Sequence, residues 1–199
     1  MDDIVKAAIK KWPNVPNCFD WLGLDARGDW YLRDAATQAA GPFPQSKGSR
    51  ITHDKLREFI QRNYEHDAQG AWFFQNGPQR VYVALELAPL VIGVRRLAGE
   101  VGGVAGDLDG LGASAVSAGG PGFVVETHAG QPVQQVLGCW LDEHGHLYLE
   151  TEHGLGVVRS LDMDAAADAI EACGWVPEDV NSAELPGRFG FVLNPQQAG

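Results

Sequence analysis

Three histidines in the second half of the chain have the residue types that bind metal ions. His144, His146 and His153 lie close together in the sequence, and Glu150 lies between them. Imidazole and carboxylate groups are the usual ligands of zinc and related divalent ions. The same residue types also gather at turns and on solvent-facing strands. Two interpretations stay open, a metal-binding module or a polar turn, and we expect the folded protein to hold no metal.

A second polar group lies in the first half and has the chemistry of a ligand contact. Arg80 and Glu86 fall on the same face of an alternating strand pattern, beside a turn that contains Asn76 and Gln79. Such residues can bind a polar ligand or a partner, or form surface ion pairs with neighbouring strands. The sequence therefore gives Asn76, Gln79, Arg80 and Glu86 as candidate binding residues, with both interpretations open.

The three cysteines do not form a recognisable redox or zinc motif. Cys18, Cys139 and Cys173 are odd in number, widely spaced and without a Cys-x-x-Cys pair. We expect buried thiols, with Cys18 or Cys139 as a nucleophile in the alternative interpretation.

The segment 110–115 has glycines like those of a dinucleotide-binding loop but lacks the strand and helix which that loop requires. We therefore assign no catalytic residue and no cofactor.

The polar residues are positioned by a short sequence that occurs three times. Asp25, Asp67 and Asp142 are each followed three positions later by a glycine and then by large aromatic or aliphatic residues. An aspartate can open a type I turn, and a glycine at this spacing can adopt positive φ and return the chain as a second strand. The repeats predict three β-hairpin corners, with Gly28, Gly70 and Gly145 at positive φ.

Helical periodicity appears in three places between these hairpins. The spacing predicts a helix over 4–12, a helix after a Thr52 N-cap with Phe59, Ile60 and Tyr64 on one face, and a helix ending at Cys173. The predicted fold class is α+β: antiparallel sheets built from repeated β-hairpins, with one main helix in each of two related small lobes. We expect a first lobe over 1–97, a Gly-rich loop or linker over 98–122, and an acidic second lobe over 123–199.

Charge is divided unevenly between the two halves. Residues 1–97 carry thirteen Lys and Arg against eleven Asp and Glu, a net of +2, whereas residues 98–199 carry two against fifteen, a net of −13. An acidic chain with pI near 4.8 is a poor match for nucleic acid. The acidic face expected around the third hairpin comprises Glu126, Asp142, Glu143, Glu150 and Glu152. Arginines of the first half or a basic protein partner can balance this charge, and the net charges favour the partner.

No apolar run approaches the roughly 20 residues of a membrane helix, and the start of the chain is acidic where a secretory signal is basic. We therefore expect a cytoplasmic protein without membrane contact.

The sequence resembles a proteobacterial family of uncharacterised conserved hypothetical proteins at Phe74-Gln75-Asn76-Gly77-Pro78-Gln79-Arg80-Val81-Tyr82-Val83, with further matches at Trp12-Pro13-Asn14-Val15-Pro16 and Ile60-Gln61-Arg62-Asn63-Tyr64. Residues 25–94 are also distantly similar to a second uncharacterised family, whose members carry Asp-x-x-Gly hairpins and a Val-Glu-Asp-Ala-Pro strand end. The matching strand end here is Leu85-Glu86-Leu87-Ala88-Pro89. The resemblance implies a small α+β fold with repeated hairpins and an adaptor or signalling role. No catalytic residues come with it, because none is established for either family.

These observations favour a non-enzymatic binding or adaptor protein. The first alternative is a small-molecule sensor or an enzyme with a site between the lobes, using Arg80, Glu86 and Cys18 or His146. The second alternative is the metal-binding module. A deep polar cavity, converging metal ligands and an exposed apolar patch are the features that separate these possibilities.

Overall fold

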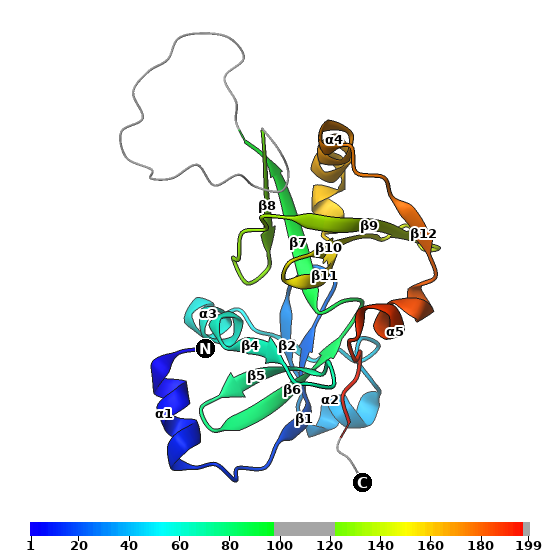
Figure 1. Cartoon of the computed structure of the whole chain (residues 1–199). Helices are drawn as coiled ribbons and strands as arrows, with labels where there is room; N and C mark the ends of the chain where they lie inside the picture. Colours follow the sequence, from blue (N-terminus) through cyan, green and yellow to red (C-terminus); the bar gives the residue numbers. More distant parts are fainter. Residues whose placement is uncertain (98–121, 197–199) are drawn as a thin grey trace.

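The structure is a computed structural model that describes residues 1–97 and 122–196. The segment predicted as a linker lies outside the described residues, apart from Gly122. Two six-stranded sheets form the body of the molecule, one in each lobe (Figure 1).

The first sheet is assembled mainly from hairpins of the first 85 residues. Neighbouring strands pair antiparallel except β1 and β6, which are parallel. In spatial order the strands are β3 (Ser49–Arg50), β2 (Trp30–Leu32), β1 (Cys18–Leu24), β6 (Gln79–Leu85), β5 (Trp72–Asn76) and β4 (Tyr64–His66).

The second sheet has the same number of strands and also mixes strand directions. The pairs β12·β9 and β11·β7 are parallel, and the other pairs are antiparallel. In spatial order the strands are β12 (Glu178–Val180), β9 (Val136–Asp142), β10 (Leu147–Thr151), β11 (Gly154–Val158), β7 (Leu90–Arg96) and β8 (Phe123–Thr127).

Helices cover the sheets and include the three predicted from periodicity. Two short 3-10 turns, η1 (Ser160–Asp162) and η2 (Ser182–Glu184), accompany α1 (Asp3–Lys11), α2 (Ala35–Ala40), α3 (Asp54–Arg62), α4 (Met163–Cys173) and α5 (Leu185–Phe189). Within the described ranges, no helix is both long and apolar enough to cross a membrane.

The helix ends differ from expectation at α3 and agree at α4. His53, not Thr52, caps α3, because its Nδ1 accepts the Leu56 N–H at 3.3 Å. Tyr64 lies in β4 rather than on the helix. The predicted end of α4 at Cys173 is confirmed, and Gly174 follows it in the left-handed conformation that glycine adopts without strain.

The α+β class and the two similar lobes are confirmed, but the sheets are mixed rather than purely antiparallel. Strand β7 lies before the expected boundary at residue 97, yet it pairs with β8 and β11 of the second sheet. Its residues Leu90, Val91, Ile92 and Val94 are all buried. A strand that is apolar on both faces is buried on both faces. In the second sheet β7 pairs between β11 and β8, and α4 and η1 pack against it. The change from one sheet to the other therefore falls between Leu85 and Leu90.

One hydrophobic core joins the two lobes. Its largest cluster includes Leu24 and Trp30 of the first sheet together with Leu149 and Val157 of the second. The two lobes therefore share buried surface rather than touching only through a linker.

His128 strengthens the contact between the lobes. Its ring, which follows β8, lies 5.6 Å from the Trp30 ring and 5.7 Å from the Tyr64 ring, centroid to centroid. Its Nδ1 accepts the Val91 N–H at 3.2 Å, and Gln61 donates its side-chain N–H to the His128 carbonyl at 2.7 Å. Burial, together with the charge of Arg159, lowers the pKa of His128 to about 4. A neutral imidazole therefore occupies this contact at neutral pH.

The end of the chain returns to the first lobe (Figure 1). The Val192 N–H donates to the Gly70 carbonyl at 3.1 Å, and the Leu85 N–H donates to the Leu193 carbonyl at 2.7 Å. The sequence analysis predicts no helix at α5. The residues that follow α5 fasten the second lobe to the first.

Candidate functional site

The three Asp-x-x-Gly corners have the same local geometry. In each, one oxygen of the aspartate, Oδ1, accepts the backbone N–H groups two and four residues later, at 2.8–3.0 Å. Gly28, Gly70 and Gly145 have φ of 87°, 78° and 81°, as predicted. The repeated sequence thus specifies a repeated turn, which we call the first corner (residues 25–29), the second corner (67–71) and the third corner (142–146).

A fourth corner follows β8 and was missed in the sequence because a threonine replaces the aspartate. Thr127 Oγ1 accepts the Gln131 N–H at 3.2 Å, and Gly130 has φ of 75°. The signal available in the sequence was the glycine three positions after a hydroxyl residue that can open the same turn. This corner carries His128 into the contact between the lobes.

The corners differ in what the second aspartate oxygen, Oδ2, binds. Asp25 Oδ2 accepts from Lys47 Nζ at 3.1 Å, and Asp67 Oδ2 accepts from the Tyr82 hydroxyl at 2.9 Å. Asp142 Oδ2 accepts from the Tyr148 hydroxyl and lies near His146 Nδ1, both at 2.9 Å. The turn is therefore common to the three corners, whereas the side chain held at each corner is specific.

The first and third corners face a common cavity between the lobes. Its volume is about 420 Å³, within the size range of small-molecule sites. One wall comes from the first lobe: Asp25, Ala26, Arg27, Tyr31, Lys47 and Glu86. The other wall comes from the second lobe: Gly145, His146, Val157, Val158, Ser160 and Met163.

Lys47 lies at the centre of the charged wall. Its ammonium contacts Asp25 Oδ2 and, at 2.8 Å, Glu86 Oε2, which also accepts the Ala26 N–H at 3.1 Å. Desolvation acts to lower the pKa of Lys47, but the hydrogen bonds and charges of Glu86 and Asp25 outweigh it, and the pKa is raised. Lys47 therefore stays charged at neutral pH and is not a nucleophilic amine.

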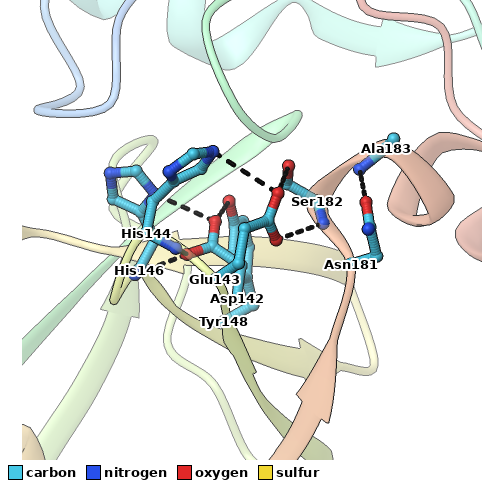
Figure 2. Close-up of polar contacts among 8 residues, drawn as sticks. All are labelled: Asp142, Glu143, His144, His146, Tyr148, Asn181, Ser182 and Ala183. Carbon is cyan, nitrogen blue, oxygen red and sulfur yellow. Dashed lines mark hydrogen bonds and ion pairs between the residues drawn. The ribbon is translucent and has the colours of Figure 1, made fainter.

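His146 is oriented by a buried carboxylate on the opposite wall. The Asp142 side chain is fully shielded from solvent, and Figure 2 shows the His146 ring beside it, whereas the His144 ring is directed to Glu143. Burial acts to raise the pKa of Asp142, but the hydrogen bonds from His146, Tyr148 and His144 outweigh it, and the pKa is lowered. An ionised carboxylate only accepts hydrogen bonds, so the proton of a neutral His146 lies on Nδ1 and Nε2 is an acceptor.

Arg27 and His146 each present to the cavity a polar group that has no partner among the residues that the structure describes. The Arg27 guanidinium is exposed at the first corner and makes no ion pair there. The His146 Nε2 atom makes no hydrogen bond within the same ranges. Together they place a guanidinium and an unpartnered imidazole nitrogen on opposite walls of the cavity.

The model of the DUF2944 family, described as a protein of unknown function (DUF2946), matches residues 1–196. The chain belongs to this family. This finding confirms the resemblance to uncharacterised proteins and, in keeping with the family's description, brings no activity with it.

Two crystal structures are similar to the chain. A DUF1285 family protein from Shewanella baltica OS155 is 18% identical, with 75% of this chain and 91% of that chain covered and a TM-score of 0.44. A DUF1285 family protein from Silicibacter pomeroyi DSS-3 is 13% identical, with 84% of each chain covered and a TM-score of 0.44. No curated protein matches the chain.

The candidate metal ligands contact separate partners, although the rings of His144 and His146 lie 6.1 Å apart, centroid to centroid. His144 Nε2 lies 3.4 Å from Glu143, whereas His153 Nε2 contacts the Pro132 carbonyl at 3.0 Å. Glu150 lies against Gly138 beside the Trp140 ring. Among the described residues, no three His, Cys, Asp or Glu side chains converge to hold a metal ion.

The candidate binding residues of the first lobe are divided in the same way. Arg80 lies 4.5 Å above the Phe73 ring, and Gln79 donates to the Pro16 carbonyl at 3.0 Å. Asn76 pairs with Gln79 across the end of the β5–β6 hairpin. Glu86 follows the opposite end of β6, roughly 20 Å from Arg80 along an extended strand. Of these four residues, the cavity contains only Glu86.

Sequence reasoning missed Arg27 and Lys47 as site residues. Arg27 is a variable position inside a repeated turn, and Lys47 lies in a Gly- and Pro-containing loop with no periodic pattern. Their common location depends on the pairing of strands far apart in the sequence.

The cysteines lack the properties of an activated nucleophile. Burial raises the pKa of Cys139 to about 11. Burial, with the nearby charge of Asp20, also raises the pKa of Cys18. Both shifts favour the unreactive thiol over the thiolate.

Most carboxylates of the expected acidic face are engaged in contacts within the fold. Glu143 accepts the N–H and hydroxyl of Ser182 (Figure 2), and Glu152 accepts the N–H groups of Gln134 and Gln135. Glu126 forms an ion pair with Arg95 at 3.0 Å. Arg96, also from β7, bridges Asp164 and Asp168 of α4. Arginines of the first half thus contact carboxylates of the second half. This is the arrangement that the sequence analysis gave as the alternative to charge balance by a basic protein partner.

Proposed function

We propose that the chain is a cytoplasmic, non-enzymatic binding protein that takes a small polar molecule into the cavity between its lobes. The observation that carries this proposal is the cavity itself, in which corners of the two lobes face each other with Arg27 and His146 Nε2 unpartnered within the described residues. Binding sites of this size commonly combine a few placed polar groups with an apolar wall, here Val157, Val158 and Met163.

Binding rather than catalysis is favoured by the protonation states of the nucleophile candidates. Lys47 remains an ammonium, and the thiols of Cys18 and Cys139 have raised pKa values. A molecule that contacts both corners would stabilise the arrangement of the lobes, which is the property a sensor requires.

A thermal-shift screen of small metabolites tests this proposal. A compound present at 100 times its Kd adds about 2.7 kcal/mol to the free energy of unfolding, or roughly 5–10 °C in Tm for a chain of this size. The shift should disappear in Ser160→Trp, because Ser160 is exposed at the cavity and a tryptophan there fills it.

The matched control is Ala167→Trp, which adds the same ring to an exposed position of α4 outside the cavity. This variant should retain the shift. A screen without any stabilising compound, or shifts that are equal in Ser160→Trp and wild type, would refute the proposal.

A second candidate function, an adaptor for a basic protein partner, is supported by carboxylates at the edge of the second lobe. Glu171, Glu178, Asp179 and Glu184 are exposed and form no ion pair with any described residue. They lie on α4, β12 and η2, which follow one side of the molecule (Figure 1). A dense negative surface attracts a basic partner and makes binding sensitive to salt.

Pull-down at low and high salt tests the adaptor proposal. Wild type should recover partners at low salt and lose them at high salt, and Glu178→Gln with Asp179→Asn should lower recovery. The control pair Asp3→Asn with Glu58→Gln removes the same charge from exposed positions of the first lobe. Equal recovery by all three proteins at both salt concentrations would mean that the acidic edge serves solubility.

A further inference from the structure

The cavity has an unpaired negative charge at one place and an unpaired positive charge at another. Asp25 and Glu86 share the single ammonium of Lys47, which leaves one surplus negative charge. Arg27 lines the same cavity, and the structure gives it no ion pair with either carboxylate or with any other described residue. The cavity is therefore dipolar: its four charged groups sum to zero, but the positive and negative surpluses lie at separate side chains.

The remaining hydrogen-bonding capacity follows the same division. Both oxygens of Asp25 are already engaged, by two backbone N–H groups and by Lys47. Glu86 uses Oε2 for Lys47 and the Ala26 N–H, which leaves Oε1 available. His146 Nε2 is a second available acceptor, because Nδ1 is held by Asp142. The cavity thus has a guanidinium for an anionic group and two acceptors for a cationic group.

A ligand with one charge fits this arrangement poorly. A simple anion would pair with Arg27 but leave the negative surplus of Glu86 without a partner, and a simple cation would do the reverse. Unpaired charge in a partly dehydrated site is costly. A molecule that carries both charges satisfies both groups at once and adds no net charge to an acidic protein.

The second lobe supplies the third feature of the site, an apolar wall. Val157 and Val158 of β11 are buried, and Met163 at the start of α4 is half-buried. This wall can receive an aliphatic or thioether side chain of the ligand.

We propose that the cavity binds a free α-amino acid with an apolar side chain, with its carboxylate on Arg27, its ammonium between Glu86 and His146, and its side chain against the valines and Met163. This inference rests on the proposed function, a small-molecule site between the lobes, and names its ligand class. A guanidinium fork is suited to carboxylate geometry.

Titration of the full chain with L-leucine, followed by the backbone N–H signals of the first and third corners in NMR spectra, tests the ligand class. Two analogues isolate the charges: 4-methylpentanoate lacks the amine, and 3-methylbutylamine lacks the carboxylate. L-leucine should shift the signals of both corners, and each analogue should bind at least tenfold more weakly.

Arg27→Gln should weaken L-leucine binding at least tenfold, whereas Lys55→Gln should leave it unchanged. Both variants remove one exposed positive charge, and Lys55 of α3 does not line the cavity. A circular dichroism spectrum equal to that of wild type establishes that Arg27→Gln folds.

The outcomes distinguish an error in the ligand class from an error in the proposed small-molecule binding function. The ligand class is wrong if an analogue binds as tightly as L-leucine, if Arg27→Gln binds L-leucine normally, or if L-leucine moves neither corner while the thermal-shift screen yields another cavity ligand. The proposed function itself falls only if no compound stabilises the protein through the cavity.

Discussion

At the scale of single residues, aspartate and glycine together make each corner. The aspartate satisfies two backbone N–H groups, and the glycine adopts a backbone conformation that other residues reach only with strain. At the cavity, the first and third corners hold Arg27 and His146 in place.

Substituting the corner glycines should have unequal effects. Gly145→Ala introduces only backbone strain, because its Cβ would meet nothing within 4 Å, and should cost about 1–2 kcal/mol of unfolding free energy. Gly70→Ala should cost clearly more, because its Cβ would lie 1.9 Å from the Gly190 carbonyl oxygen. Urea unfolding of both variants measures the difference, and equal losses would contradict the close contact with the returning C-terminal segment.

His128 should make the protein sensitive to acid. Its pKa is about 4 in the folded protein and near 6.5 in the unfolded chain. The neutral ring therefore contributes stability that is complete above pH 6.5 and is lost as the pH falls toward 4. We expect a loss of about 2 kcal/mol between pH 8 and pH 5.

Urea unfolding at several pH values checks this expectation. His128→Phe keeps a ring between Trp30 and Tyr64 but cannot be protonated, so it should lose most of the pH dependence between 8 and 5. His53→Gln, at an exposed position, should keep it. An unchanged slope in His128→Phe would show that other groups cause the acid sensitivity.

At the scale of elements, local patterns predicted what local interactions determine. The helix that ends at Cys173 and the three corners were identified from periodicity and turn residues, because their hydrogen bonds join neighbours in the sequence. The sheet to which β7 belongs was not identified from the sequence. The choice between β6 and β11 as its neighbour depends on burial across the whole fold. For the same reason, the meeting of Arg27, Lys47 and His146 could not be foreseen.

The position of β7 makes a prediction about fragments. A chain that ends at residue 97 keeps the whole first sheet but leaves Leu90, Val91, Ile92 and Val94 without their partners in β8 and β11. Such a fragment should aggregate because it exposes an unpaired apolar strand. Size-exclusion chromatography with the full chain as control checks this, and a monomeric fragment with cooperative unfolding would contradict it.

At the scale of the whole molecule, the two lobes behave as one body with a cavity at their junction. The shared core, the His128 contact and the returning C-terminal segment join them. We expect one cooperative unfolding transition, seen at the same urea concentration by tryptophan fluorescence and by circular dichroism. Two separated transitions would mean that the lobes unfold independently and that the cavity is not held by both.

The central claim is that the cavity between the first and third corners is a binding site. A crystal structure of the protein with the compound that gives the largest thermal shift tests it most directly. We predict that the compound lies between Arg27 and His146 and contacts residues of both lobes. A compound bound on another surface, with the cavity containing only solvent, would contradict the claim.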